Sequence, residues 1–141
     1  MNKINAGRVI LGGLIAGVII DIVAGVMDGI IFSDQWAAAM KAIGRPGTLS
    51  VKQIVASNVL GLAIGILAVW LYAAIRPRFG PGPKTALRAG CAVWLLVYAI
   101  SSAPLAFLHI FPLGLELAVT AIGLVEVLVA TLAGAYFYKE A

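Results

Sequence analysis

The chain alternates between long apolar runs and short polar breaks. Four apolar runs cover approximately residues 9–32, 53–75, 89–111 and 115–138. Each run exceeds the roughly 20 residues that a helix needs to cross about 30 Å of hydrocarbon. The pattern therefore predicts an all-α fold, in which a bundle of four transmembrane helices forms a single membrane domain over residues 1–141.

A short polar segment separates the first run from the second. It predicts a helix over about residues 34–43, which ends at the glycine- and proline-containing stretch 44–47. Trp36, Met40 and Ile43 fall on one side of this helix. We expect an amphipathic helix that lies flat on the outer membrane surface, with this side toward lipid. The alternative is a helix that plugs the outer mouth of the bundle, and periodicity does not separate the two.

Composition supports the membrane class and excludes a nucleic-acid-binding role. Hydrophobic residues make up 62% of the 141 residues and charged residues 11%, whereas soluble domains have about 45–50% and about 25%. The net charge of +4 comes from basic residues at the ends of apolar runs, where they orient membrane helices. The single Cys91 cannot form a disulfide within the chain.

The distribution of basic residues predicts the orientation. With the N-terminus in the cytoplasm, seven of the Lys and Arg residues lie inside and three lie outside. The inside set is Lys3, Arg8, Arg76, Arg78, Lys84, Arg88 and Lys139, and the outside set is Lys41, Arg45 and Lys52. The excess of inside charge places both termini in the cytoplasm.

Two acids interrupt the first apolar run. Asp21 and Asp28 are seven residues apart and therefore share one face of a helix. Gly17, Ala24 and Gly25 lie on the same face, and small residues let another helix approach closely. We therefore expect this face, with its carboxylates, to point into the protein.

A third acid, Glu126, lies near the middle of the fourth run, and Asp21 lies near the middle of the first. The two runs are antiparallel, so their midpoints share a depth. We expect the two carboxylates to meet at the bilayer centre if these helices are neighbours. No Lys or Arg occurs at that depth. At neutral pH, then, at least one acid is protonated, or a bound cation neutralises the pair.

Further polar residues cluster toward the outer side. Asn58 enters the second run at a depth similar to that of Asp28, and Ser101 and Ser102 lie in the outer half of the third. Pro104 follows them and cannot donate a backbone hydrogen bond, which frees a carbonyl near Ile100. We expect these groups to line one polar cavity that is open to the outside. The alternative is that the acids are protonated and only hydrogen-bond across the helix packing.

The sequence offers no catalytic or metal centre. A Ser/His/Asp set, a P-loop, a Cys-x-x-Cys pair and a dinucleotide glycine motif are absent. The single His109 supplies neither a zinc site nor two haem ligands. Asp34 and Glu116 each begin a helix, where a carboxylate suits the helix dipole. We therefore expect no enzyme, no metal and no cofactor.

The stretch IIFSDQWAAAMKAIG at residues 30–44 follows a glycine-rich first run and precedes three more runs. Together with GCAVW at residues 90–94, it resembles a bacterial family of small four-helix inner-membrane proteins of unassigned function. The resemblance implies a multi-pass fold in the bacterial inner membrane. It implies no activity, and no functional residue is carried over.

These patterns leave three function classes. The first is a small transporter of protons, a cation or a cationic amphiphile, with Asp21 and Glu126 as the exchanging pair and Asp28 with Asn58 as the outer vestibule. Four helices make a thin wall for a path, so a homodimer is plausible. The second is an accessory or assembly subunit that docks a larger membrane complex through its glycine-rich helix faces. The third is a lipid-modifying enzyme, which is disfavoured because the sequence shows no nucleophile–base pair.

Overall fold

The computed structural model describes residues 3–140, which form helices and no strand. Four helical stretches are long and apolar enough to cross a membrane, as the hydrophobic pattern predicts: Ala6–Ile31, Val51–Phe79, Pro83–Phe107 and Leu113–Phe137. The second and fourth are the continuous helices α3 (Val51–Phe79) and α6 (Leu113–Phe137). The fold class is therefore all-helical.

The other two long helices each contain a π-helical segment. The first consists of α1 (Ala6–Val26) followed by η1 (Met27–Ile31). The third consists of α4 (Pro83–Trp94), η2 (Leu95–Ile100) and α5 (Ser101–Phe107). A π turn inserts one extra residue into the helix, and such segments are frequent at functional sites. Neither segment is evident in the hydrophobic pattern.

The third long helix begins and ends earlier than the predicted 89–111. Pro83 occupies its first turn, where a missing backbone N–H costs nothing. Gly82 before it has a φ of 120°, a conformation that side chains rarely adopt. At the other end, His109 has a φ of 52°, which is incompatible with continuing the helix.

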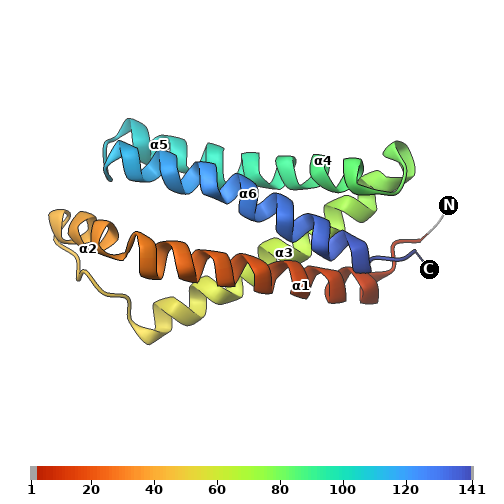
Figure 1. The fold of residues 1–141 in the computed structure, drawn as a ribbon, viewed down its shortest axis with the longest axis horizontal. Helices are drawn as coiled ribbons and strands as arrows, with labels where there is room; N and C mark the ends of the chain where they lie inside the picture. The colour runs from red at the N-terminus through yellow and green to blue at the C-terminus, as the bar shows by residue number, and fades with distance from the viewer. Residues whose placement is uncertain (1–2, 141) are drawn as a thin grey trace.

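The helices run back and forth, so the segments next to both termini lie at one end (Figure 1). There the backbone N–H of Asn5 donates to the hydroxyl of Tyr138, at 3.3 Å. Helix α1 packs against α3 and α6, and α4 packs against α6 and α3. Helices α2 and α5 lie at the opposite end, called the α2 end below (Figure 1).

Glycines allow the close contact between α1 and α3. Gly13 and Gly17 on α1 face Gly61 and Gly65 on α3. A Cβ atom added at Gly65 would overlap the backbone N of Gly17 and the backbone O of Gly13. This is the small-residue packing of membrane helices, and it fixes the depth at which the two helices touch.

Beyond this contact the two helices diverge. Residues 51–60 of α3 are all exposed, whereas packing against the bundle begins at Gly61. In Figure 1 this first part of α3, in yellow, runs away from α1 toward the α2 end. The divergence leaves space between η1, α2 and α3.

Helix α2 (Ser33–Ala42) closes part of this space with one side and leaves Asp34, Gln35, Ala38 and Lys41 exposed on the other. The Trp36 ring packs edge-on against Phe111, with 5.4 Å between ring centroids. Its indole N–H donates to Oδ1 of Asp28, at 3.0 Å. This differs from the favoured expectation, because Trp36 and Met40 face a cavity of the protein. A half-buried indole N–H gains from a hydrogen-bond acceptor, and Asp28 provides it. Only Ile43 remains exposed as expected.

Candidate functional site

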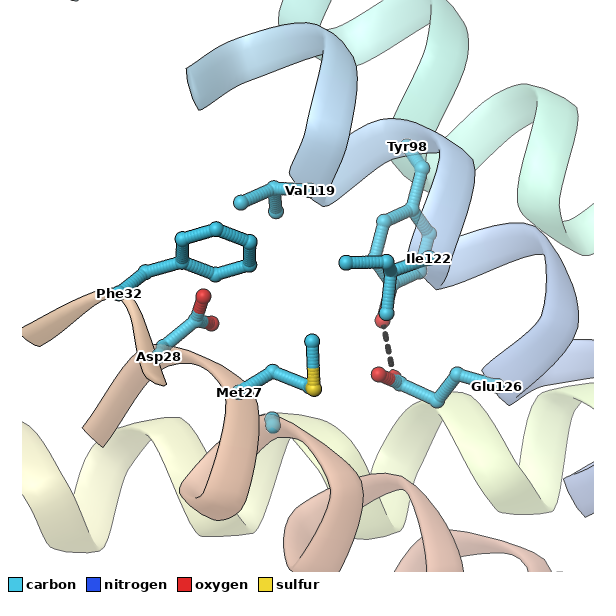
Figure 2. Close-up of a pocket in the computed structure, with 8 residues that line it drawn as sticks. Met27, Asp28, Phe32, Tyr98, Val119, Ile122 and Glu126 are labelled. Carbon is cyan, nitrogen blue, oxygen red and sulfur yellow. Dashed lines mark hydrogen bonds between the residues drawn. The ribbon is translucent and has the colours of Figure 1, made fainter. Parts of the chain in front are cut away.

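A small cavity lies between η1, η2 and α6, and the two π-helical segments contribute side chains to it. Figure 2 shows Asp28 and Met27 on one side and Tyr98, Ile122 and Glu126 on the other. A π turn rotates the residues that follow it relative to an unbroken α-helix, and each of the two π-helical segments contributes a side chain to this cavity. The two irregular segments thus place a carboxylate and a phenol around one cavity.

Glu126 forms the buried side of this cavity. It is only 6% exposed, and the Tyr98 hydroxyl donates to its Oε1 at 2.7 Å (Figure 2). Gly123, one turn earlier on α6, gives the Tyr98 ring its space, because a Cβ there would collide with the ring. The pair is therefore held rigidly, and one carboxylate oxygen of Glu126 already has a partner.

Asp28 borders the same cavity from the opposite side. Its Oδ1 accepts the hydrogen bond from Trp36 described above. Within residues 3–140, no hydrogen bond reaches its second oxygen. The carboxylate is thus oriented by the indole and retains accepting capacity.

A second, larger cavity of about 600 Å³ lies between η1, α2 and the diverging part of α3. Its wall combines two carboxylates and an amide with an indole, a thioether and aliphatic carbon. The residues that carry these groups are Asp21, Asp28, Asn58, Trp36, Met40 and Ile54.

Asp21 lies where α1 and α3 separate. Its carboxylate rests on Gly61, since a Cβ added there would overlap Oδ1 of Asp21. It is partly exposed and makes no hydrogen bond to any residue that the structure describes. Gly61 thus provides the space for this side chain, and the large cavity lies in front of it.

The three acids form a row across the two cavities, and α1 and α6 are neighbours, as the predicted approach of Asp21 to Glu126 requires. Asp21 borders the large cavity, Glu126 borders the small one, and Asp28 borders both. Within residues 3–140, Asp21 and Glu126 make no hydrogen bond to each other, and Tyr98 donates to Oε1 of Glu126. Convergence of the acids within the protein agrees with the sequence analysis, and the intermediate position of Asp28 differs from it.

Asn58 and the two serines have different surroundings. Asn58 borders the large cavity together with Asp28, as expected, and its amide donates to the Ile54 carbonyl at 2.8 Å. Ser101 and Ser102 border neither cavity. Their hydroxyls donate to the carbonyls of Val97 and Ala99 in η2. These carbonyls lie in the π-helical segment, so the serine hydroxyls satisfy backbone acceptors there. The Ser102 hydroxyl also lies 3.3 Å from that of Thr120 on α6.

No Lys or Arg in the described part of the chain lines either cavity. The single ion pair of residues 3–140 is at the terminal end, between Arg76 and Glu140 at 3.5 Å. Within the same range, no group of three or more His, Cys, Asp or Glu side chains is placed to hold a metal ion. Among residues 3–140, the row of acids therefore has no Lys or Arg beside it in either cavity.

Sequence reasoning missed the hydrogen-bond donors of the site. It assigns Tyr98 and Trp36 no role at the acids, although both carry a polar atom in an apolar setting. Such a side chain needs a partner when it is buried. Trp94 follows the same rule, because its N–H donates to the Thr120 carbonyl at 2.8 Å.

Comparisons with family models, with curated proteins and with solved structures found no match to this chain. The function is therefore argued from the geometry of the site.

Proposed function

We propose that this chain is a multi-pass protein of the bacterial inner membrane that carries a small cationic or amphiphilic substrate, linked to protons or another cation. The four long apolar helices span the bilayer in this proposal. The end that carries both termini faces the cytoplasm, because most Lys and Arg residues lie there. The two cavities then open toward the outer half of the membrane.

The row of three acids without a cation supports this proposal. A charged carboxylate inside a membrane is costly, so it must be protonated or must bind a cation. Asp28 borders both cavities and places the two sites in electrostatic contact. A proton and a cationic substrate then compete for the same negative charge, and this competition couples their movement.

A purely structural role fits these acids less well. Glu126 is satisfied by Tyr98 and would suit it. Asp21, however, has no hydrogen bond to residues 3–140 and borders a cavity. Helix packing gains nothing from a carboxylate in that position, whereas ligand binding does.

An accessory or assembly subunit remains the second candidate, with weaker support. Its docking faces were expected to be glycine-rich, but six glycines of α1, α3 and α6 are already used for packing inside the bundle: Gly12, Gly13, Gly17, Gly61, Gly65 and Gly134. Gly25 and Gly29 are free of contacts and border the large cavity. A partner, or a second copy in a homodimer, would have to place a cation there.

The test of the proposal is coupled flux in sealed vesicles. The purified chain is reconstituted around a trapped pH-sensitive dye, and inorganic and organic cations are added in turn. We expect at least one of them to drive proton movement. Asp21→Asn and Glu126→Gln each lower its rate by about tenfold or more, because each removes a charged hydrogen-bonding group.

Asp34→Asn is the matched control, because Asp34 is exposed at the start of α2 and borders neither cavity. Its rate should equal that of the unmodified chain. Proton movement no faster than in empty vesicles, for every cation, would refute the transport proposal. So would unchanged rates in both acid variants.

A further inference from the structure

The size of the large cavity indicates what kind of cation it accommodates. Sites for drug-sized organic molecules have volumes of about 300–1,000 Å³, and this cavity has about 600 Å³. A dehydrated inorganic ion is held instead by a tight shell of several oxygen ligands. The lining offers two widely separated carboxylates and no such shell within the described residues.

The lining is also chemically divided. Asp21 and Asp28 lie on one side, about 10 Å apart along the helix from its rise per residue. The other walls carry the Trp36 indole, the Met40 thioether and the aliphatic side chain of Ile54. An indole face attracts cations, and a thioether packs well against aromatic ligands. A ligand with an ammonium group and an apolar body matches both parts.

The way into the cavity points to an amphiphile. Residues of α3 that border it, such as Ile54 and Asn58, belong to the exposed part of the helix. The cavity therefore reaches the side surface of the bundle between α1 and α3. In a bilayer this side faces the acyl chains, from which an amphiphile can enter without crossing water.

We propose that the cavity between η1, α2 and α3 binds an amphiphilic organic cation, with its ammonium group on Asp21, in the longer-range electric field of Asp28, and its apolar body against Trp36, Met40 and Ile54. This inference rests on the proposed function and names the substrate class of the same site. The Glu126–Tyr98 pair lies outside this cavity, in the smaller one. In this proposal the Glu126–Tyr98 pair binds the proton that is exchanged.

The test is equilibrium binding of dansylcadaverine, an aromatic body linked to a primary ammonium, to the full chain in lipid nanodiscs. Fluorescence anisotropy reports binding, and empty nanodiscs give the lipid background. The N-acetylated form is the matched neutral ligand. We expect the amine to bind saturably and about tenfold or more tightly than the acetylated form, because a charged hydrogen bond is lost on acetylation.

Asp21→Asn is expected to weaken amine binding by about tenfold, because it removes a charged hydrogen bond. Asp28→Asn, which removes only a more distant charge, is expected to weaken it by less, and both variants should leave the acetylated form unaffected. The Asp34→Asn variant should bind like the unmodified chain, and thermal unfolding verifies that all variants fold. Methylammonium, which lacks the apolar body, should compete only at far higher concentration. Equal affinity for both dansyl ligands, or equal affinity in all variants, would overturn the inference.

The outcomes for binding and for transport are separable. Proton flux driven only by inorganic cations, without dansylcadaverine binding, would overturn this inference and leave the transport proposal standing. Saturable, Asp21-dependent binding without any coupled proton flux would support the inference and refute transport.

Discussion

Replacing Gly65 with valine is expected to break the contact between α1 and α3 and to lower the free energy of unfolding by about 1–3 kcal/mol or more. The new Cβ would meet the backbone of Gly13 and Gly17. Backbone atoms cannot rotate away as a side chain can, so the two helices must separate. Because dispersion and close packing hold membrane helices together, little else compensates. Thermal unfolding in detergent measures the effect.

Gly25→Val is the matched control for this substitution. It makes the same change in α1, but nothing lies within 4 Å of the new Cβ. Its unfolding temperature should stay close to that of the unmodified chain, apart from the small helix-propensity difference. Equal unfolding temperatures for the Gly65 and Gly25 variants would show that α1 and α3 do not pack at these glycines.

Replacing Gly61 with alanine is expected to abolish most ligand binding while the fold persists. The new methyl group would occupy the position of the Asp21 carboxylate. This carboxylate is the end of a flexible side chain, so it moves aside and the helices stay in place. Alanine also favours helix over glycine by about 0.5–1 kcal/mol. We expect cation binding about tenfold weaker, with an unchanged or higher unfolding temperature.

The double variant Gly61→Ala/Asp21→Asn shows why the Gly61→Ala chain loses ligand binding. If Gly61→Ala acts by displacing Asp21, then adding Asp21→Asn should cause little further loss, because the two changes remove the same interaction. Gly114→Ala, at a position with open space around it, controls for the substitution itself. Additive losses in the double variant would mean that Asp21 does not rest on Gly61.

The hydrophobic pattern predicted the four long helices because one strong driving force sets each of them, the burial of about 20 apolar residues in lipid. The inward direction of Asp21 and Asp28 was predictable for a similar reason. Their spacing of seven residues, with Gly17 one turn before Asp21, defines one face before any tertiary contact is known.

Residues that depend on irregular backbone could not be predicted. Tyr98 borders the small cavity from the π-helical segment η2, and a single extra residue in a helix leaves no mark on apolar periodicity. The large cavity depends on the divergence of α3 from α1 over residues 51–60, which precede the contact at Gly61. That divergence is a balance of contacts between distant segments, which periodicity along one segment does not report.

The side of α2 that faces the protein was also beyond the sequence. Trp36 is equally suited to a membrane surface and to a buried contact. The choice is made by Asp28 and Phe111, which are its partners in the folded chain. The amphipathic pattern of α2 is the same whether the helix packs its apolar side against the protein or against lipid.

Asp28 of η1 and Glu126 of α6 border the same small cavity. Cross-linking tests this convergence most directly. Asp28 and Glu126 are replaced by cysteine in a Cys91→Ala chain, and a short bifunctional thiol reagent is added to native membranes. We expect an intramolecular link between positions 28 and 126, which mass analysis of the joined peptides identifies. A control chain with cysteines at positions 34 and 126 should show little linkage. No link between 28 and 126, or equal linkage in the control pair, would contradict it.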